Sequence, residues 1–325
     1  MNNPIKVGVL GVGALGYHHA RLYAACETAD LVGVYDLNED RAREVAAEAG
    51  TEVFTDPHAL AREVQAVSIA VPTNHHFDVG CAMLEMGKHL LLEKPITETV
   101  EQAHKLLALA DEKGLIVQVG HVERFNPVID YLEEKLNNPR FIESHRLSPY
   151  PPARPGMLPR GTEVSVVLDL MIHDIDMVLS LVKSDVVDLD AVGIPVLSPT
   201  EDIANARLKF ANGCVANLTA SRITPEPMRK IRVFQHDAYL SLDYMARTGE
   251  IYYKENGRIT RGKVPVTDHN ALMKELEHFV SSVAHHNQSG KCPDSKVAGI
   301  HGTRAMEVAE RVIEAMREVN PLRQG

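Results

Sequence analysis

The sequence has little of what marks several classes of protein. Its cysteines are scattered with no CxxC pair, which argues against a disulfide framework and a tight zinc site: Cys26, Cys81, Cys214 and Cys292. No run approaches the roughly 18 consecutive apolar residues of a membrane-spanning helix. Positive charge is in deficit, because 34 Lys and Arg stand against 44 Asp and Glu, for a net charge of −10. We therefore expect a cytoplasmic globular protein with reduced thiols that binds neither nucleic acid nor membrane.

The first 120 residues alternate short β-branched runs with helical patterns. The runs are apolar throughout, as in strands that are buried on both faces: residues 5–10, 31–35, 66–71, 89–93 and 115–120. Asp56 and Thr97 have the side chains of helix N-caps, and Gly50, Gly87 and Gly114 are typical of helix ends. Strand–helix alternation of this kind predicts a parallel sheet with helices on both faces.

The pattern changes after about residue 122. A proline-rich segment over 148–160 is followed by an apolar helix candidate over 164–182 and a final amphipathic stretch over 301–318. Between them lie strand-like stretches, two of which are joined by the hairpin dipeptide Asn212-Gly213: residues 186–196, 203–210, 214–223, 229–236, 239–244 and 250–254. We predict an α/β protein with a doubly wound parallel Rossmann sheet in residues 1–121. Residues 122–325 are predicted to form an α+β domain with a mostly antiparallel open sheet.

A glycine motif predicts a dinucleotide site at the end of the first strand. The segment 11–16 reads GVGALG and opens a helical pattern, and Asp36 ends the second strand 20 residues later. Gly11 permits the tight turn, Gly13 lets the backbone approach a pyrophosphate, and Gly16 allows close helix packing. The Asp36 carboxylate would accept hydrogen bonds from ribose hydroxyls and repel a 2′-phosphate, which favours NAD over NADP. Arg41, the nearest cation, leaves NADP open.

Two further segments end predicted strands at the same edge of the sheet. Pro72, Thr73 and Asn74 could line the nicotinamide side, or form an ordinary helix entry with a capping side chain. Glu93 and Lys94 end the run 89–93. The residues that we expect at the cofactor are Gly11, Gly13, Ala14, Leu15, Gly16, Asp36, Arg41, Pro72, Thr73, Asn74, Glu93 and Lys94.

The candidates for chemistry are a lysine and a carboxylate–imidazole pair. The charge of Lys94 would stabilise the alkoxide that forms as an alcohol loses its proton. Asp169 and His173 are four residues apart, so a helix would place them on one face, with Asp176 bordering it. A carboxylate behind an imidazole suits a general base. A hydrogen-bonded core network and a metal site are the alternatives, but no cysteine or second histidine lies at zinc-ligand spacing.

Together, GxGxxG at 11–16, Glu93-Lys94-Pro95 and Asp169…His173 resemble the glucose–fructose oxidoreductase/inositol dehydrogenase family of NAD(P)-dependent oxidoreductases. The resemblance covers nearly the whole chain. It implies a Rossmann domain followed by an open α/β domain whose sheet face often makes the oligomer contact, so that we expect a homo-oligomer, a dimer or a tetramer. It also implies catalytic roles for Lys94, Asp169 and His173, and a cis Lys94–Pro95 bond.

A narrower resemblance points to a substrate. Residues 120–127 (GHVERFNP), 168–181 and 197–208 are similar to the UDP-N-acetylglucosamine 3-dehydrogenase branch, which oxidises the sugar 3-hydroxyl to a ketone ahead of amination by an aminotransferase. One departure is Leu170-Met171-Ile172, where the broader family often has small glycine-rich residues. The substrate-binding residues expected on this basis are Lys94, Arg124, Asn126, Arg154, Arg160, Asp169 and His173.

Other functions on the same scaffold stay open at this point. They are oxidation of inositol or another sugar, and an NAD-dependent glycosidase that oxidises C3 transiently and gives no net NADH. A non-catalytic NAD-sensing regulator is a different class, and it would be indifferent to mutation of Lys94 or His173. A metal-dependent hydrolase is a more distant alternative, because we expect no metal.

Overall fold

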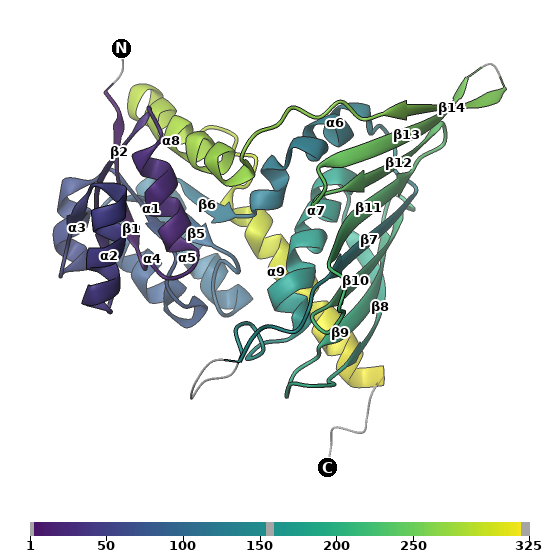
Figure 1. Cartoon of the computed structure of the whole chain (residues 1–325), viewed down its shortest axis with the longest axis horizontal. Coiled ribbons are helices and arrows are strands. Elements are labelled where there is room, and N and C mark those ends of the chain that lie inside the picture. Colours follow the sequence, from purple (N-terminus) through teal and green to yellow (C-terminus); the bar gives the residue numbers. More distant parts are fainter. Residues whose placement is uncertain (1–2, 154–158, 256, 320–325) are drawn as a thin grey trace. The chain divides into compact units, whose positions relative to one another are not determined.

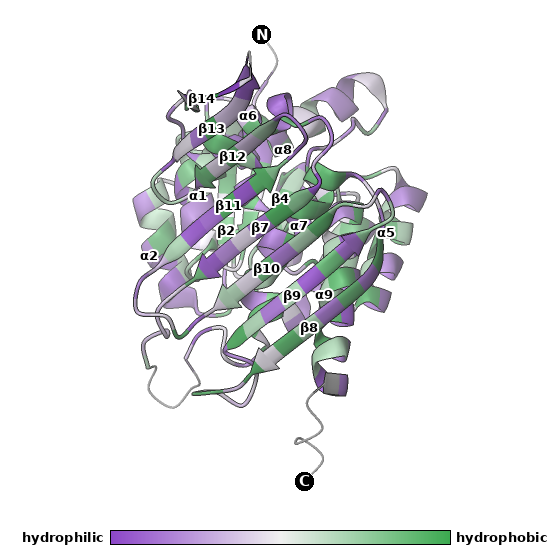
Figure 2. Cartoon of the chain, turned by 90° about the vertical axis from the view of Figure 1, so that its right-hand side faces the viewer, coloured by the Kyte–Doolittle hydropathy of each residue, from purple (hydrophilic) through white to green (hydrophobic). Residues whose placement is uncertain are grey.

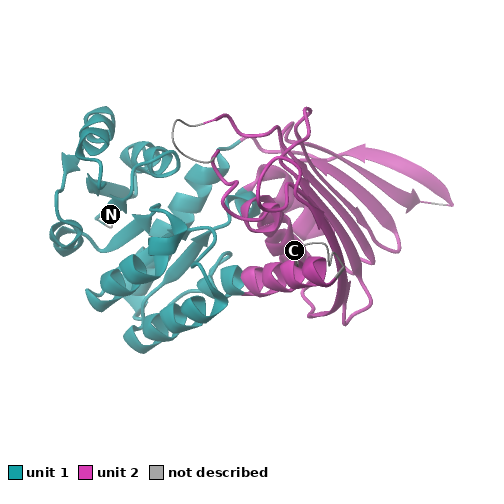
Figure 3. Cartoon of the chain, turned by 90° about the horizontal axis from the view of Figure 1, so that it is seen from below, with its two compact units in different colours: residues 1–125, 269–303 teal, residues 126–268, 304–325 magenta. Residues whose placement is uncertain are grey.

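The computed structural model describes residues 3–153, 159–255 and 257–319 and divides the chain into two compact units (Figure 1). Unit 1 comprises residues 1–125 and 269–303, and unit 2 comprises residues 126–268 and 304–325 (Figure 3). The change near residue 122 that the sequence shows lies close to the first of these boundaries. The prediction that all of 122–325 forms one second domain differs from the structure, because residues 269–303 pack in unit 1.

Unit 1 contains a parallel sheet in the order β3-β2-β1-β4-β5-β6, which confirms the predicted doubly wound sheet. Its strands are β1 (Ile5–Leu10), β2 (Ala29–Tyr35), β3 (Glu52–Val53), β4 (Ala66–Ile69), β5 (His89–Glu93) and β6 (Val117–Gly120). All neighbouring strands in it are paired in parallel. The strand order reverses between β1 and β4, and ligands of such sheets bind outside the carboxyl ends of the strands at this point.

Helices connect these strands, as the sequence patterns predict. They are α1 (Gly16–Ala24), α2 (Glu39–Ala49), α3 (Pro57–Glu63), η1 (Thr73–His75), α4 (His76–Glu85), α5 (Val100–Lys113) and η2 (Val122–Phe125). Asp56 caps α3 as expected, by accepting hydrogen bonds from two backbone amides. The assignment of Thr97 as the cap of α5 is wrong. Thr99 is the cap, because Gln102 lies three residues beyond it and completes a reciprocal capping box.

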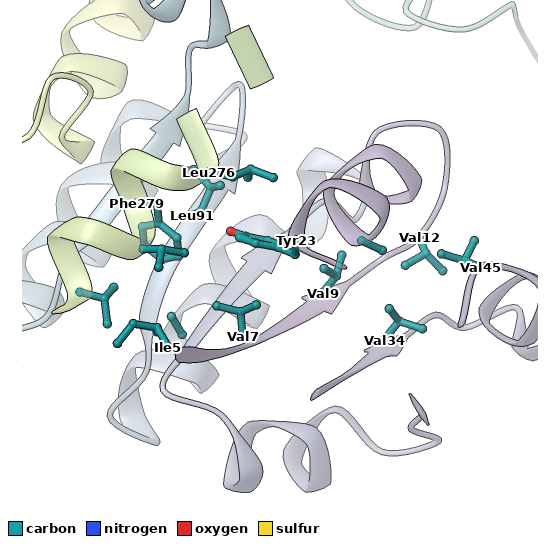
Figure 4. Packing of buried hydrophobic residues seen from close by; sticks show 14 of the residues in the cluster. Ile5, Val7, Val9, Val12, Tyr23, Val34, Val45, Leu91, Leu276 and Phe279 are labelled. Atoms are coloured by element: carbon teal, nitrogen blue, oxygen red, sulfur yellow. The ribbon is translucent and has the colours of Figure 1, made fainter. Parts of the chain in front are cut away.

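The core of unit 1 includes a helix that the sequence reading did not assign there. Leu276 and Phe279 of α8 (Ala271–Ser289) belong to the same buried cluster as Val7, Val9 and Tyr23 (Figure 4). The apolar face of α8 is therefore satisfied by the Rossmann sheet, and this packing makes residues 269–303 part of unit 1. None of the helices in the described ranges is long and apolar enough to cross a membrane.

Unit 2 contains an eight-stranded sheet in the order β14-β13-β12-β11-β7-β10-β9-β8. Its strands are β7 (Phe141–Leu147), β8 (Val186–Ile194), β9 (Ile203–Phe210), β10 (Val215–Ser221), β11 (Met228–Phe234), β12 (Ala238–Asp243), β13 (Thr248–Glu255) and β14 (Arg258–Lys263). Only the β7–β10 pair is parallel, so the predicted mostly antiparallel sheet is confirmed. The sequence reading missed β7 and β14.

Helices of unit 2 cover one face of this sheet, and its other face is open (Figures 1 and 2). The helices are α6 (Pro127–Lys135), α7 (Ile172–Val182) and α9 (Gly299–Val319), whose first residues belong to unit 1. A π-helical turn, η3 (Val167–Met171), precedes α7. The predicted plain helix over 164–182 is thus corrected to a π-turn that leads into a shorter α-helix.

Candidate active site

The three glycines after β1 are required for different steric reasons. Gly11 has a φ of +82°, and a Cβ there would lie 2.8 Å from the Ala70 carbonyl group. A Cβ at Gly16 would collide with the carbonyl oxygen of Gly11. Gly13 is exposed and faces open space, with no atom within 4 Å of a Cβ built on it. The turn is therefore closed on its protein side and open at Gly13, where a ligand could approach the backbone.

Asp36, which directly follows β2, and Arg41, in the first turn of α2, both contact this turn at Val12. The Asp36 carboxylate accepts a hydrogen bond of 2.7 Å from the Val12 amide and one of 2.8 Å from the Asn38 amide. Arg41 donates to the Val12 carbonyl at 3.0 Å and to Glu44 at 2.7 Å. The carboxylate oxygens keep acceptor capacity for ribose hydroxyls, whereas the guanidinium is already engaged by protein oxygens.

These residues fit a bound dinucleotide. No described side chain caps α1 at Leu15, and Ala14 and Leu15 are exposed, so a ligand could reach the backbone of the turn at the positive end of the helix. The open space over Gly13 lies at the same point of the chain. A pyrophosphate could be held there by backbone amides alone, which explains how a protein of net charge −10 accommodates it.

The segment after β4 is anchored by a buried histidine. Pro72 and Asn74 are exposed and Thr73 is half-buried, and Thr73 begins η1. The His76 ring lies between two carbonyl oxygens, 2.9 Å from that of Pro95 and 2.9 Å from that of Val71. Burial lowers the pKa of His76, although both carbonyl contacts oppose this shift. His76 thereby ties the segment 71–76 to the residues that follow β5, a role that the sequence reading missed.

Glu93 is buried beside Lys94 and contacts both α1 and the Lys94 backbone. Its carboxylate lies 2.9 Å from His19 Nε2 of α1 and accepts a 3.3 Å hydrogen bond from the Lys94 amide. Burial raises the pKa of Glu93, but the hydrogen bond and charge of His19 and the charge of Lys94 outweigh it, so the pKa is lowered. Glu93 is therefore an ionised internal anchor for the end of β5, and its contact with a cofactor stays a prediction. Lys94 is half-exposed, and the Lys94–Pro95 bond is cis.

In unit 2, the structure places Asp169 in the π-turn η3 and His173 in the first turn of α7. Both side chains are half-exposed, whereas Asp174 and Asp176 are buried. Asp174 accepts 2.7 Å hydrogen bonds from Ser144 and from Arg146, both on β7. These buried contacts, which sequence reasoning missed, fix α7 to the sheet at Asp174, the residue next to His173. π-Turns are frequent at functional sites.

The other predicted substrate residues differ in their surroundings. Arg124 is buried in unit 1 and donates to the Lys296 carbonyl at 3.5 Å. Asn126 is buried in unit 2, where it caps α6 and donates to the Tyr244 carbonyl at 3.4 Å. Arg160 is exposed, and Arg154 lies outside the described residues. Their contacts with a substrate stay predictions.

Comparisons with known proteins agree with this arrangement. A model of the oxidoreductase family with an NAD-binding Rossmann fold, GFO_IDH_MocA, matches residues 5–121, and its C-terminal domain model matches residues 132–241. A UDP-N-acetylglucosamine 3-dehydrogenase from Acidithiobacillus ferrooxidans is 40% identical over 289 residues, covering 87% of this chain and 90% of that protein. The solved structure of the enzyme of that name from this organism matches with a TM-score of 0.88 at 38% identity, covering 98% and 99% of the two chains. A scyllo-inositol 2-dehydrogenase (NAD(+)) from Bacillus subtilis is 26% identical over 350 residues, covering 99% and 97%.

The two family models lie in the order that the two sheets follow along the chain, and the glycine turn and Lys94 both lie in the first of them. With this match and a relative that spans most of its length, the chain belongs to the glucose–fructose oxidoreductase/inositol dehydrogenase (GFO/IDH/MocA) family and is an NAD-dependent oxidoreductase.

Proposed function

We propose that this enzyme oxidises the 3-hydroxyl of UDP-N-acetylglucosamine to the 3-keto sugar in the cytoplasm. The observation that carries the proposal is the 40% identity, over 87% of the chain, to a UDP-N-acetylglucosamine 3-dehydrogenase. NAD, when bound, supplies the hydride acceptor. The glycine turn and Asp36 would hold its adenosine diphosphate half, and the segment 72–74 and Lys94 its nicotinamide half. Arg124, Asn126, Arg154 and Arg160 are the proposed contacts of the nucleotide sugar.

The chemistry is assigned to three side chains. His173 removes the proton from the sugar hydroxyl, and Asp169 orients its imidazole and supports the charged form. Lys94 stabilises the developing oxyanion or shares the role of base. The half-exposure of all three supports this assignment, because a reacting group needs access to substrate, while the anchors Glu93 and Asp174 beside them are buried.

The activity is tested by offering purified protein a panel of nucleotide sugars with NAD. NADH absorbance and a 3-keto product by mass spectrometry are expected with UDP-N-acetylglucosamine. Because the scyllo-inositol dehydrogenase matches 99% of the chain, inositols belong in the same panel. Preferential turnover of an inositol would overturn the nucleotide-sugar proposal, and glycoside cleavage without net NADH would indicate the glycosidase chemistry.

Lys94→Ala tests the catalytic assignment. We expect kcat to fall by about 100-fold or more, because positioned proton-transfer groups contribute roughly 10²- to 10⁴-fold. The dissociation constant of NAD, measured by fluorescence titration, should rise far less than kcat falls, because the glycine turn and Asp36 still hold the adenosine diphosphate half of NAD. Lys105→Ala, an exposed lysine of α5, is the control. Undiminished turnover in Lys94→Ala and His173→Asn would remove both residues from the mechanism. An NAD-sensing regulator would instead be favoured if the wild type binds NAD but turns over no substrate in the panel.

Two partners belong to this proposal. A 3-keto nucleotide sugar is a substrate for an aminotransferase, which we propose as the next enzyme. The open face of the unit 2 sheet (Figure 2) is the proposed contact of a homo-oligomer, a dimer or a tetramer. The ring contacts across its strands form a row of aromatic side chains.

A further inference from the structure

Arg222 is the largest of the fully buried side chains in the described part of the chain, and all of its donors are used. It directly follows β10, and its Nε donates to Asp202 at 2.8 Å. Nη2 donates to the hydroxyls of Ser198 and Thr200 at 3.0 and 2.8 Å. Nη1 donates to the carbonyls of Gly161 and Val164 at 2.5 and 2.8 Å. A guanidinium has five N–H groups in a rigid fork, and here each has an acceptor.

This network is held in its charged form. Asp202 is fully buried and accepts hydrogen bonds from the amides of residues 196–198 and from the Ser198 hydroxyl, as well as from Arg222. Burial raises the pKa of Asp202, but these hydrogen bonds outweigh it and hold the pKa far below its usual value. An ionised carboxylate beside a fully paired guanidinium makes a rigid cluster, because removing either partner would leave a buried charge uncompensated.

The cluster fixes the chain that leads into η3. The Val164 carbonyl, one of the two bound by Arg222, also accepts a 2.8 Å hydrogen bond from Thr200. The Val166 amide donates to the Glu201 carbonyl at 3.0 Å. Residues 161–166 are thus held from the side of β9 and β10. The π-turn begins immediately afterwards, at Val167.

Gly161 connects this cluster to Asp169, because it contacts both Arg222 and the Asp169 carboxylate. Its φ is +81°, a conformation that favours glycine, and a Cβ built on it would collide with Oδ2 of Asp169. The Asp169 carboxylate therefore lies directly against the backbone of Gly161, whose carbonyl oxygen is held by Arg222.

We propose that Arg222 is a positioning residue for Asp169, acting through Gly161. The guanidinium fixes the Gly161 peptide, and that peptide fixes the place of the carboxylate that orients His173. This inference rests on the proposed catalytic role of Asp169, and it adds Arg222 and Gly161 as residues that act through Asp169.

Gly161→Ala and Gly213→Ala form a matched pair of variants for the test. Gly213 has a φ of +82°, but a Cβ there meets only the Arg140 side chain, at 3.4 Å. Both variants carry similar backbone strain in the same unit, and only Gly161→Ala pushes on Asp169. We expect kcat with UDP-N-acetylglucosamine to fall about 10- to 100-fold in Gly161→Ala, since small displacements of catalytic groups have effects of this size. Gly213→Ala should keep the wild-type kcat, and both should bind NAD as the wild type does.

Arg222→Lys and Thr200→Val test the hydrogen-bonded cluster around Arg222 that holds the Gly161 backbone. Lysine keeps the charge beside Asp202 but lacks the fork that reaches Gly161, so kcat should fall about tenfold at unchanged NAD affinity. Thr200→Val removes one acceptor and should have a smaller effect in the same direction. A primary deuterium isotope effect on kcat with 3-deuterated sugar should rise in Arg222→Lys, because a displaced base slows the chemical step itself. Merely lowered stability would leave that ratio unchanged.

Asp169→Asn, measured alongside, separates the two hypotheses. If it loses turnover while Gly161→Ala and Arg222→Lys keep the wild-type kcat and isotope effect in folded protein, the positioning role is overturned and the catalytic role stands. If Asp169→Asn retains full turnover, the catalytic role fails and the positioning role with it. Loss of kcat in Gly161→Ala and Arg222→Lys, with Gly213→Ala unaffected, supports both.

Discussion

The buried side chain of His89 makes the stability of the folded protein depend on pH. His89 begins β5, is 4% exposed, and accepts a 3.0 Å hydrogen bond from the Ile116 amide at Nδ1. Burial, together with the charges of His286 and Lys88, lowers its pKa to about 4. The unfolded chain, with a histidine pKa near 6.5, binds more protons between these two values. The stability that His89 contributes is therefore complete above pH of about 6.5 and is lost as the pH falls toward 4.

We expect the free energy of unfolding to drop by up to about 3 kcal/mol from this group between pH 6.5 and 4. Urea unfolding at several pH values should show that the free energy of unfolding depends less on pH in His89→Gln than in the wild type between pH of about 6.5 and 4. His58→Gln, at an exposed histidine, is the control and should leave the slope as it is. Equal slopes in the wild type and His89→Gln would contradict the assignment.

At the scale of the elements, a capping box begins α5, two residues after the segment 94–97. The Thr99 hydroxyl accepts from the Gln102 amide at 3.2 Å, and the Gln102 side chain accepts from the Thr99 amide at 3.3 Å. Both hydrogen bonds satisfy amides that a helix N-terminus leaves without partners. The cap thus defines where the chain leaves the Lys94 segment and becomes helical.

Thr99→Ala should destabilise the protein by about 1 kcal/mol, the usual cost of losing an N-cap hydroxyl. Thermal unfolding of this variant can be compared with that of Thr55→Ala, an exposed loop threonine whose loss should cost less than about 0.5 kcal/mol. A melting temperature for Thr99→Ala as high as that of the control would show that the capping box contributes nothing measurable.

At the scale of the whole molecule, the open face of the eight-stranded sheet carries aromatic side chains that the fold leaves partly exposed. Four half-exposed rings form a row across strands β7, β11, β12 and β13, with centroid separations of 5.6, 4.5 and 5.4 Å: Phe141, Phe234, Tyr239 and Tyr252. A second copy of the chain would remove these rings from water, which favours association through this face.

Tyr239→Asp places a charge within this row. We expect it to shift the molecular mass, measured by light scattering after gel filtration, toward that of a smaller assembly, because an unpaired carboxylate at a buried interface is costly. Tyr131→Asp alters a half-buried tyrosine of α6 and should keep the wild-type mass. The wild-type mass in Tyr239→Asp would exclude this face as the oligomer contact.

Much of the fold and of the candidate cofactor site could be predicted from local sequence patterns. Buried parallel strands, the glycine turn and Asp36 are readable from residues close together in the chain, because steric limits on a turn and the pairing of a strand end with a helix start are local requirements. The residues Lys94, Asp169 and His173 also stand out in sequence as candidates for chemistry, and the family resemblance implies catalytic roles for them.

Other features required the tertiary structure. The apolar face of α8 could be recognised as helical, but only packing against β1 and Tyr23 shows that it belongs to unit 1. His19, Asp174 and Arg222 are polar residues whose partners lie 74, 28 and 61 residues away at Glu93, Arg146 and Gly161. No periodicity encodes such pairs, because a buried ion pair depends on which surfaces meet after folding. The sequence by itself thus determined the fold class and the cofactor turn, and the tertiary structure decided which buried polar groups lie beside the candidate catalytic side chains.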